Sequence, residues 1–413
     1  MAAPSEYVSR TRENRDREAI AEESNRIQGW IQMKLVVRTL SLLSLVACMI
    51  SPMGSAQAVT EIGGEKIVTL TRTPSSTTKP EFTSITILPG RGMELQQVTA
   101  NFPGKGKVDV LASPDLAESA KMLDKDDTEN GDLGYRLGSA FLVPYPNRIR
   151  GKLSADGKTL TTEWQGKTIT LPANNIGKNA DAERHAMHGL ILKAKATDVK
   201  VTKILGGQKV TAIFHAGDFG GHWLSKTDLV YSISLTADAV DATIVARNVG
   251  DEPEPMAIGW HPYFNLPSGD RTQARLHIPG SELATVDNYD NVFPTGKLIP
   301  VEGQYDLRAP DGKPLDNNFY DDNWSKLERK NGAVTVKVID PAAHYGVDIM
   351  GLSPEIKTIQ AYAPPTKQFV AIEHQYNFGD PFGKVWGSMD TGMITLKPGQ
   401  STKWHVRLHV FVP

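Results

Sequence analysis

The C-terminal stretch places the strongest constraint on the fold. Apolar residues occupy every second position there: Trp404, Val406, Leu408, Val410 and Val412. Successive side chains of a β-strand point to opposite faces, so this alternation indicates an antiparallel strand with one face buried. Similar alternation recurs at residues 229–235 and 334–338, and no stretch has a helical stripe long enough for a crossover helix. The sequence therefore predicts an all-β protein, a large antiparallel β-sandwich.

Turn signals agree with many short strands. The chain contains 36 glycines and 26 prolines, spread along its length, as tight turns between strands require. Residues 159–164 and 168–171, joined by Gln165-Gly166-Lys167, predict a β-hairpin. Residues 115–125 give the one clear helical pattern. No low-complexity linker divides residues 59–413, which we expect to form a single domain.

The N-terminal region has the layout of a targeting segment. Residues 1–32 are polar and charge-rich, and Met33 then opens a short basic stretch. An apolar run at 39–50 and the small residues Ala56-Gln57-Ala58 complete the pattern of a secretory signal. We expect translation to start at Met33, residues 33–58 to be a signal peptide and residues 1–32 to be a charged extension that is not translated. The protein is then exported, to the periplasm or out of the cell.

The single cysteine, Cys48, leaves a second route open. Leu45-Val46-Ala47-Cys48 resembles a bacterial lipobox, which would make the mature protein a lipoprotein anchored at Cys48. Cleavage after Ala58 would instead remove the cysteine, and the position of the A-x-A site favours this route. Neither route allows a structural disulfide. The apolar run is too short to span a bilayer comfortably, so no membrane span is expected.

Charge and motifs exclude several classes of function. The formal net charge is -2, so no basic surface points to nucleic acid as a partner. The chain lacks the G-x-S-x-G nucleophile motif, a Walker loop and a dinucleotide fingerprint, and nothing in it calls for a cofactor. The remaining chemistry is proton transfer by histidines and carboxylates.

His261 is the first candidate for this chemistry. It lies in Trp260-His261-Pro262-Tyr263-Phe264, where aromatic rings and a proline limit both water and backbone freedom. An imidazole is the side chain that most readily donates or accepts a proton near neutral pH. The alternative is a structural histidine packed beside aromatic residues.

Glu373 is the second candidate. It ends the apolar run 369–372, where partial desolvation would raise its pKa and make it a base near neutral pH. The alternative is a glutamate paired with a structural arginine.

Two further stretches contain candidate residues, for which an exposed turn arginine and an ordinary loop aspartate are the alternatives. Asn147 and Arg148 place an amide beside a guanidinium fork, which suits paired hydrogen bonds to vicinal hydroxyls. Asp316 stands between apolar neighbours, but Asp321 and Asp322 follow closely, so spacing alone does not decide which acid matters.

His185 and His188 have the HxxH spacing of some zinc ligands. No third ligand lies nearby in the sequence and the segment is not helical, so no metal site is expected. His188 precedes Gly189 and is better interpreted as a loop imidazole whose backbone comes close to a ligand.

In order along the chain, these stretches resemble the aldose 1-epimerase (galactose mutarotase) family, from about Phe82 to the C-terminus. Family members carry an N-R-I segment, a histidine-glycine loop, a histidine followed by x-Y-F-N, an aspartate in a D-x-x-F context and a late glutamate. Here the corresponding residues are Asn147-Arg148-Ile149, His188-Gly189, His261 to Asn265, Asp316 to Phe319 and Glu373.

The resemblance implies a mutarotase-like supersandwich, a large β-sandwich with an open cleft on one sheet. It also implies an enzyme that interconverts the α and β anomers of a free aldose such as glucose or galactose. Glu373 would take the proton of the anomeric hydroxyl while His261 gives one to the ring oxygen. His188 would bind near the ring oxygen, and Asn147, Arg148 and Asp316 would hold the sugar. A monomer or a weak dimer is expected.

Two departures affect substrate preference: Leu190 replaces the second glycine of the histidine loop, and His374 to Asn377 differ from the family's proline-containing version. Two other functions stay open. A non-catalytic carbohydrate-binding protein would not need both His261 and Glu373. A glycosidase would use Asp316 and Glu373 as a carboxylate pair.

Overall fold

The computed structural model describes residues 59–126, 133–177, 179 and 182–413. The predicted charged extension, the signal peptide and Cys48 lie outside the described residues and stay predictions. The proposed division of the chain into domains also stays a prediction.

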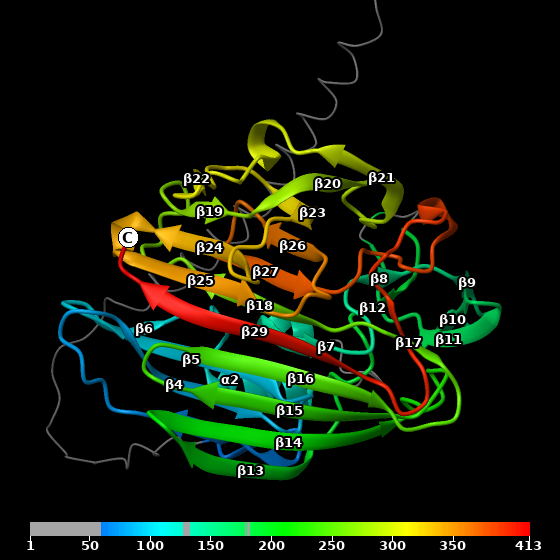
Figure 1. The fold of residues 1–413 in the computed structure, drawn as a ribbon, viewed down its shortest axis with the longest axis horizontal. Coiled ribbons are helices and arrows are strands. Elements are labelled where there is room, and N and C mark those ends of the chain that lie inside the picture. The colour runs from blue at the N-terminus through cyan, green and yellow to red at the C-terminus, as the bar shows by residue number, and fades with distance from the viewer. Residues whose placement is uncertain (1–58, 127–132, 178, 180–181) are drawn as a thin grey trace, which may run out of the picture. The chain divides into compact units, whose positions relative to one another are not determined.

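Two large antiparallel sheets organise the described residues (Figure 1). In spatial order, the nine-stranded sheet contains β13 (Thr197–Ile204), β14 (Gly207–Gly217), β15 (Thr227–Leu235), β16 (Val240–Asn248), β29 (Ser401–Phe411), β25 (Tyr345–Gly351), β24 (Val334–Asp340), β19 (Arg275–His277) and β22 (Lys313–Pro314). The seven-stranded sheet contains β21 (Pro294–Pro300), β20 (Gly280–Val286), β23 (Tyr320–Leu327), β26 (Thr358–Ala363), β27 (Phe369–Gln375), β18 (Gly259–Asn265) and β7 (Ser139–Leu142).

Smaller sheets extend this pair. A four-stranded sheet contains β3 (Val68–Thr71), β4 (Glu81–Leu88), β5 (Glu94–Phe102) and β6 (Gly106–Asp109), and a three-stranded sheet contains β11 (Lys167–Pro172), β10 (Thr159–Trp164) and β9 (Lys152–Leu153). The two-stranded pairs are β1 (Glu61–Ile62) with β2 (Glu65–Lys66), β8 (Arg148–Ile149) with β12 (Ala186–Met187), and β17 (Glu254–Met256) with β28 (Ile394–Leu396).

Aromatic side chains join the two large sheets face to face. The ring of Phe141 on β7 lies 5.5 Å from Tyr231 on β15 and 6.0 Å from Trp404 on β29, measured between ring centroids. The indole nitrogen of Trp404 also donates to the backbone oxygen of His374 on β27 at 3.0 Å. Buried residues of both sheets share one continuous core. The predicted all-β antiparallel sandwich is therefore confirmed.

Local predictions agree closely with the structure. On β29 Trp404, Val406, Leu408 and Val410 are buried while Lys403 and Arg407 are exposed, as the alternation predicted, but Val412 lies beyond the strand and is exposed. The hairpin forms from β10 and β11. The helical pattern becomes α2 (Leu116–Asp124), whose N-cap Asp115 accepts a hydrogen bond from the Glu118 amide at 2.8 Å. Nowhere in the described part of the chain is a helix both long and apolar enough to cross a membrane.

Candidate active site

Residues far apart in the sequence form one row across the seven-stranded sheet. Asn323 of β23 pairs with Gln360 of β26, which pairs in turn with Glu373 of β27. The register between β27 and β18, continued by two residues, sets Glu373 opposite His261. The strands therefore bring a base candidate and an acid candidate together. We refer to Asn323, Gln360, Glu373 and His261 as the polar row.

The polar row lies on the face of the sheet opposite the core. Trp260 and Ile372, which precede His261 and Glu373 in sequence, both belong to the buried core. Since strand side chains alternate between faces, the polar residues must point the other way. His374 shows the contrast: it lies on the core side, and burial lowers its pKa to about 3.

His261 and Glu373 are in direct contact. Nε2 of His261 lies 3.4 Å from Oε1 of Glu373, and the two side chains are only 7% and 2% exposed. The other carboxylate oxygen of Glu373 accepts a hydrogen bond of 2.7 Å from the amide nitrogen of Gln375. Both sequence candidates for proton transfer are therefore neighbours in a site with little access to water.

Burial pushes the pKa values of this pair in opposite directions. Desolvation raises the pKa of Glu373 to about 8, and the nearby Asp321 adds to the rise. Desolvation also lowers the pKa of His261 to about 4, with the Arg148 charge acting in the same direction. Between these values the pair holds one proton and no net charge. Moving that proton from oxygen to nitrogen gives a carboxylate base and an imidazolium acid.

His188 approaches the pair from a neighbouring loop. Its ring centroid lies 4.9 Å from that of His261, and burial holds its pKa well below the ordinary value. The His188 amide donates to the Asn147 oxygen at 2.9 Å, and both residues have a positive φ of 63°. Gly189 follows at φ 80°, where an added Cβ would lie 2.4 Å from the Val143 oxygen. The backbone therefore turns tightly at the point where the imidazole is presented.

Tyr135, which was not a candidate from the sequence, packs beside His188 and His261. It belongs to the short 3-10 helix η1 (Gly134–Leu137), and its ring lies 4.9 Å from His188 and 5.9 Å from His261 between centroids. No spacing or motif signal marks it, because the contact depends on where η1 lies beside β7 and β18.

A second polar group extends from the row toward Arg148. Nη2 of Arg148 lies 3.5 Å from Oδ2 of Asp321, and Nη1 donates to Oδ1 of Asn147 at 3.2 Å. Gln360 of the polar row donates to Asp321 at 2.8 Å and accepts from Asn147 at 3.2 Å. The structure thus places Asn147 and Arg148 beside the polar row. Burial raises the pKa of Asp321, and the Arg148 charge opposes this rise.

Asp316 does not lie in this network. Its side chain is exposed on the loop before β23, and only its backbone oxygen is held, by the guanidinium of Arg271. Asp321 takes the place beside Arg148 because it lies on β23, on the same face as Asn323. Asp321 is therefore a further candidate for holding hydroxyls beside Arg148, and the role of Asp316 stays a prediction.

Buried polar atoms without a protein partner gather at this site. Within the described residues these include Nε of Arg148, Nδ1 of His188, Nδ1 of His261, Oδ1 of Asn323 and Oε1 of Gln375. Buried polar groups in folded proteins usually have a hydrogen-bond partner. A set of unpaired donors and acceptors around His261 and Glu373 is unusual for a purely structural face of a sheet.

His185 has a structural role in the HxxH segment. Its Nδ1 contacts the Glu183 oxygen and its Nε2 contacts the Asn175 amide, both at 2.9 Å. Both ring nitrogens are therefore used within the protein. In the part of the chain that the structure covers, no three His, Cys, Asp or Glu residues are grouped to hold a metal ion.

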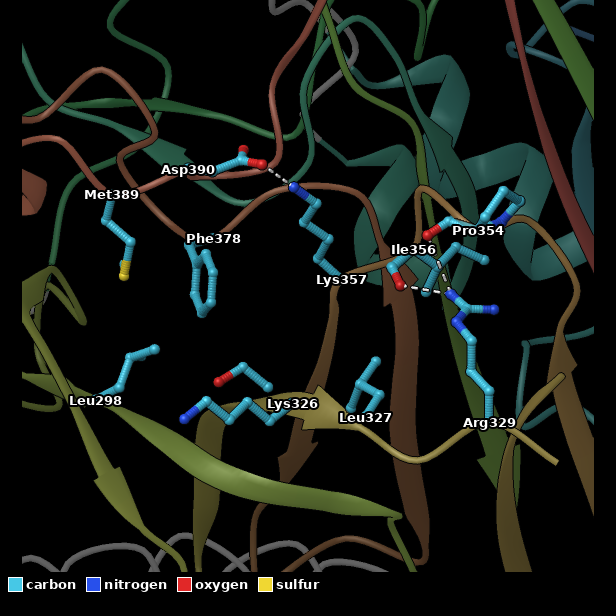
Figure 2. Close-up of a pocket in the computed structure, with 11 residues that line it drawn as sticks. Leu298, Lys326, Leu327, Arg329, Pro354, Ile356, Lys357, Phe378, Met389 and Asp390 are labelled. Atoms are coloured by element: carbon cyan, nitrogen blue, oxygen red, sulfur yellow. Dashed lines mark hydrogen bonds and ion pairs between the residues drawn. The ribbon is translucent and has the colours of Figure 1, made fainter. Parts of the chain in front are cut away.

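A separate cavity of about 320 Å³ opens at the other end of β23 (Figure 2). Phe378, Leu298, Leu327 and Met389 surround it, and none of the polar row lines it. Its rim cations are occupied: Lys326 pairs with Glu282 at 2.6 Å, Lys357 pairs with Asp390, and Arg329 donates to backbone oxygens. This cavity lacks a contact between an imidazole and a carboxyl group like that in the polar row.

Solved structures with this fold share its architecture. A galactose mutarotase-like protein from Clostridium acetobutylicum superposes with a TM-score of 0.64 at 20% identity, over 84% of this chain and 98% of that one. An aldose epimerase homologue from C. elegans gives 0.60 at 18% identity, over 83% and 99%. A galactose 1-epimerase from Lactobacillus acidophilus gives 0.57 at 15% identity, over 84% and 99%. The chain therefore has the galactose mutarotase-like fold.

Sequence comparison identifies the family. The family model for aldose 1-epimerase matches residues 129–409, more than half of the chain. The uncharacterized protein YphB of Escherichia coli is 23% identical over 274 residues, which cover 65% of this chain and 82% of that protein. This protein belongs to the aldose 1-epimerase family.

Proposed function

We propose that this protein is an aldose 1-epimerase that interconverts the α and β anomers of a free hexose such as glucose or galactose. The contact between His261 and Glu373 carries the proposal, since it places one transferable proton in a buried site beside hydrogen-bonding groups. A protein that only bound sugar would have no need to desolvate a carboxylate and an imidazole in contact.

Glu373 takes the proton from the anomeric hydroxyl in its carboxylate form, while protonated His261 gives a proton to the ring oxygen. The C1–O5 bond breaks and the anomeric carbon becomes an aldehyde. After rotation about the C1–C2 bond, the same two groups reverse their transfers and close the ring on the other face. Each proton transfer assisted in this way contributes about 10²- to 10⁴-fold to the rate.

Other residues hold the sugar and the acid in place. The amide of Gln375 fixes one Glu373 oxygen, which leaves the oxygen beside His261 for the reaction. The Arg148–Asp321 pair with Asn147 offers charged and amide groups for two hydroxyls. His188 and Tyr135 pack against His261 and set the position of its ring. These contacts around Glu373, Arg148 and His261 restrict side-chain motion and exclude water from the transferred protons.

Carbohydrate binding without catalysis stays the second candidate, because the network around Arg148 would serve it equally well. The glycosidase interpretation loses support, since its carboxylate pair required Asp316, which is exposed on a separate loop. We further propose that the protein is exported. Detection of a precursor whose N-terminus is Met1 or Ala2 would contradict the start at Met33.

Polarimetry of freshly dissolved α-D-glucose and α-D-galactose, with and without residues 59–413 as purified protein, tests the proposed activity. Faster approach to anomeric equilibrium supports it. A folded protein that binds either sugar, yet leaves both rates unchanged, would favour the binding function.

A further inference from the structure

Four aromatic side chains continue the face of the polar row along the same strands. Tyr263 lies two residues beyond His261 on β18, Phe369 lies four residues before Glu373 on β27, and Tyr362 lies two residues beyond Gln360 on β26. Even spacing along a strand keeps side chains on one face. Phe319, just before β23, completes the set. We refer to Tyr263, Phe369, Tyr362 and Phe319 as the aromatic platform.

The rings of the aromatic platform form an unbroken series that begins at the proposed catalytic pair. Tyr263 lies 5.2 Å from the His261 ring and stacks on Phe369 at 4.1 Å with an interplanar angle of 4°. Phe369 lies 6.4 Å from Tyr362, and Tyr362 lies 6.3 Å from Phe319.

The aromatic platform is not part of the core. Core aromatic residues of the same sheet, such as Trp260, Phe264 and Trp324, point to the opposite face and are 0–2% exposed. Each ring of the aromatic platform is instead partly exposed. Gly138, at φ 77°, makes room for it, because an added Cβ would lie 2.4 Å from the Tyr263 ring. The backbone therefore leaves room for this ring beside the polar row.

Polar groups border the end of the aromatic platform formed by Tyr362 and Phe319. Asp321 is the direct strand partner of Tyr362 and contacts Arg148. Asp316 and Asn317 are exposed and precede Phe319 in sequence. Small-molecule sites typically combine aromatic walls with a few placed polar groups. Sugar rings fit this combination, since their C–H faces pack on aromatic rings while their hydroxyls bind carboxylates and amides.

We infer that the aromatic platform is a second sugar subsite, and that this protein acts on the reducing end of oligosaccharides in preference to free monosaccharides. The inference rests on the proposed function and specifies its substrate class. The reducing unit occupies the polar row, and the next unit packs on Tyr362 and Phe319. A single hexose would leave these partly exposed rings without a ligand.

The test compares kcat/KM for mutarotation of glucose with that for cellobiose, maltose and lactose, which all end in a reducing glucose. Wild-type protein should prefer at least one disaccharide over glucose. Phe319→Ala and Tyr362→Ala should each lower the ratio of disaccharide to glucose kcat/KM by about three- to tenfold, the effect of one aromatic contact. Phe411→Ala, a partly exposed phenylalanine on β29 in the other sheet, should leave the ratio unchanged.

Calorimetric titration provides a readout that does not depend on catalysis. Methyl β-cellobioside should bind more tightly than methyl β-glucoside to wild-type protein, and Phe319→Ala should remove most of that difference. Equal affinities, or no preference for any disaccharide in the kinetic assay while glucose is turned over, would overturn the second subsite alone. Lack of acceleration with every sugar would overturn the proposed activity and the inference with it.

Discussion

Nε2 of His261 lies 3.4 Å from Oε1 of Glu373, across neighbouring strands of one sheet. The two residues are more than one hundred positions apart in sequence, and only the register of β18 and β27 makes them partners. Because both side chains are buried, the pair is more stable with its shared proton on Glu373, where both groups are uncharged, than with that proton on His261. A bound sugar that bridges the two groups would favour the charged arrangement needed for ring opening.

The activity should have a bell-shaped dependence on pH. Above the Glu373 pKa of about 8 the pair loses its only proton, so His261 has none to give. Below the His261 pKa of about 4 the pair gains a second proton, so Glu373 cannot act as a base. Values measured in this way belong to the pair as a whole. The profile of kcat/KM between pH 3 and about 10 measures them, and a rate that still rises above pH 9 would contradict the assignment.

Glu373→Gln should stabilise the fold at high pH. Because the folded-state pKa of Glu373 is raised, its stabilising protonated form is fully present below the unfolded value of 4.5 and is lost as pH rises through about 8. Glutamine has no carboxyl proton to lose. The free energy of unfolding of Glu373→Gln, relative to wild-type protein, should therefore rise by roughly 2–4 kcal/mol between acid and alkaline pH. Urea unfolding at pH 5 and pH 9 measures this growth.

The exposed Glu163 on β10 provides the matched control. Glu163→Gln should show no comparable gain between the two pH values. If Glu373→Gln behaves like Glu163→Gln, then Glu373 is not desolvated in the folded protein.

Asp321→Asn should weaken sugar binding more than it slows catalysis. The change removes the charge that pairs with Arg148 and leaves the His261–Glu373 contact in place. A hydrogen bond to a charged group is worth about 1.5–3 kcal/mol, so KM should rise by roughly ten- to a hundredfold with a smaller change in kcat. Asp316→Asn is the matched control and should change the glucose KM little, since Asp316 is exposed on its loop. A larger effect at Asp316 would support the original prediction for that residue.

Gly189→Ala should destabilise the protein more than Gly157→Ala. Both glycines have a positive φ, 80° and 72°, but only at Gly189 would the new Cβ meet a backbone oxygen, that of Val143 at 2.4 Å. At Gly157 nothing lies within 4 Å of it. The left-handed backbone alone should cost about 1 kcal/mol at either position, and the clash should add to this at Gly189. Thermal unfolding measures the stability of both variants. Equal losses of stability would show that the backbone at Val143 shifts to accommodate the new Cβ at no energetic cost.

Much of the fold follows from local sequence pattern. Alternating apolar residues identify strands such as β29, and the absence of long helical stripes excludes parallel βαβ units. His261, Glu373 and Arg148 could be selected because each combines a chemically able side chain with a recognisable segment. Their assembly could not be derived from pattern alone, because it depends on the register of strands distant in sequence.

Asp321 and Tyr135 show what the sequence pattern did not reveal. Asp321 lies inside β23, where alternation turns it to the same face as Asn323. Applying the period-two rule within residues 320–327 would have favoured Asp321. Tyr135 carries no signal in sequence, because its contacts with His188 and His261 arise from the packing of η1 against other segments.

The most direct test of the central claim measures the anomer exchange rate and the sugar affinity of Glu373→Gln and His261→Asn in parallel with wild-type protein. Glutamine is nearly identical in shape to glutamate, asparagine is smaller than histidine but polar, and each replacement removes one proton-transfer group. Polarimetry should show a loss of at least about a hundredfold in kcat for each variant. Calorimetry should show that each still binds the sugar. A variant with a near wild-type rate would contradict the role of the replaced residue, and two such variants would contradict the proposed mechanism as a whole.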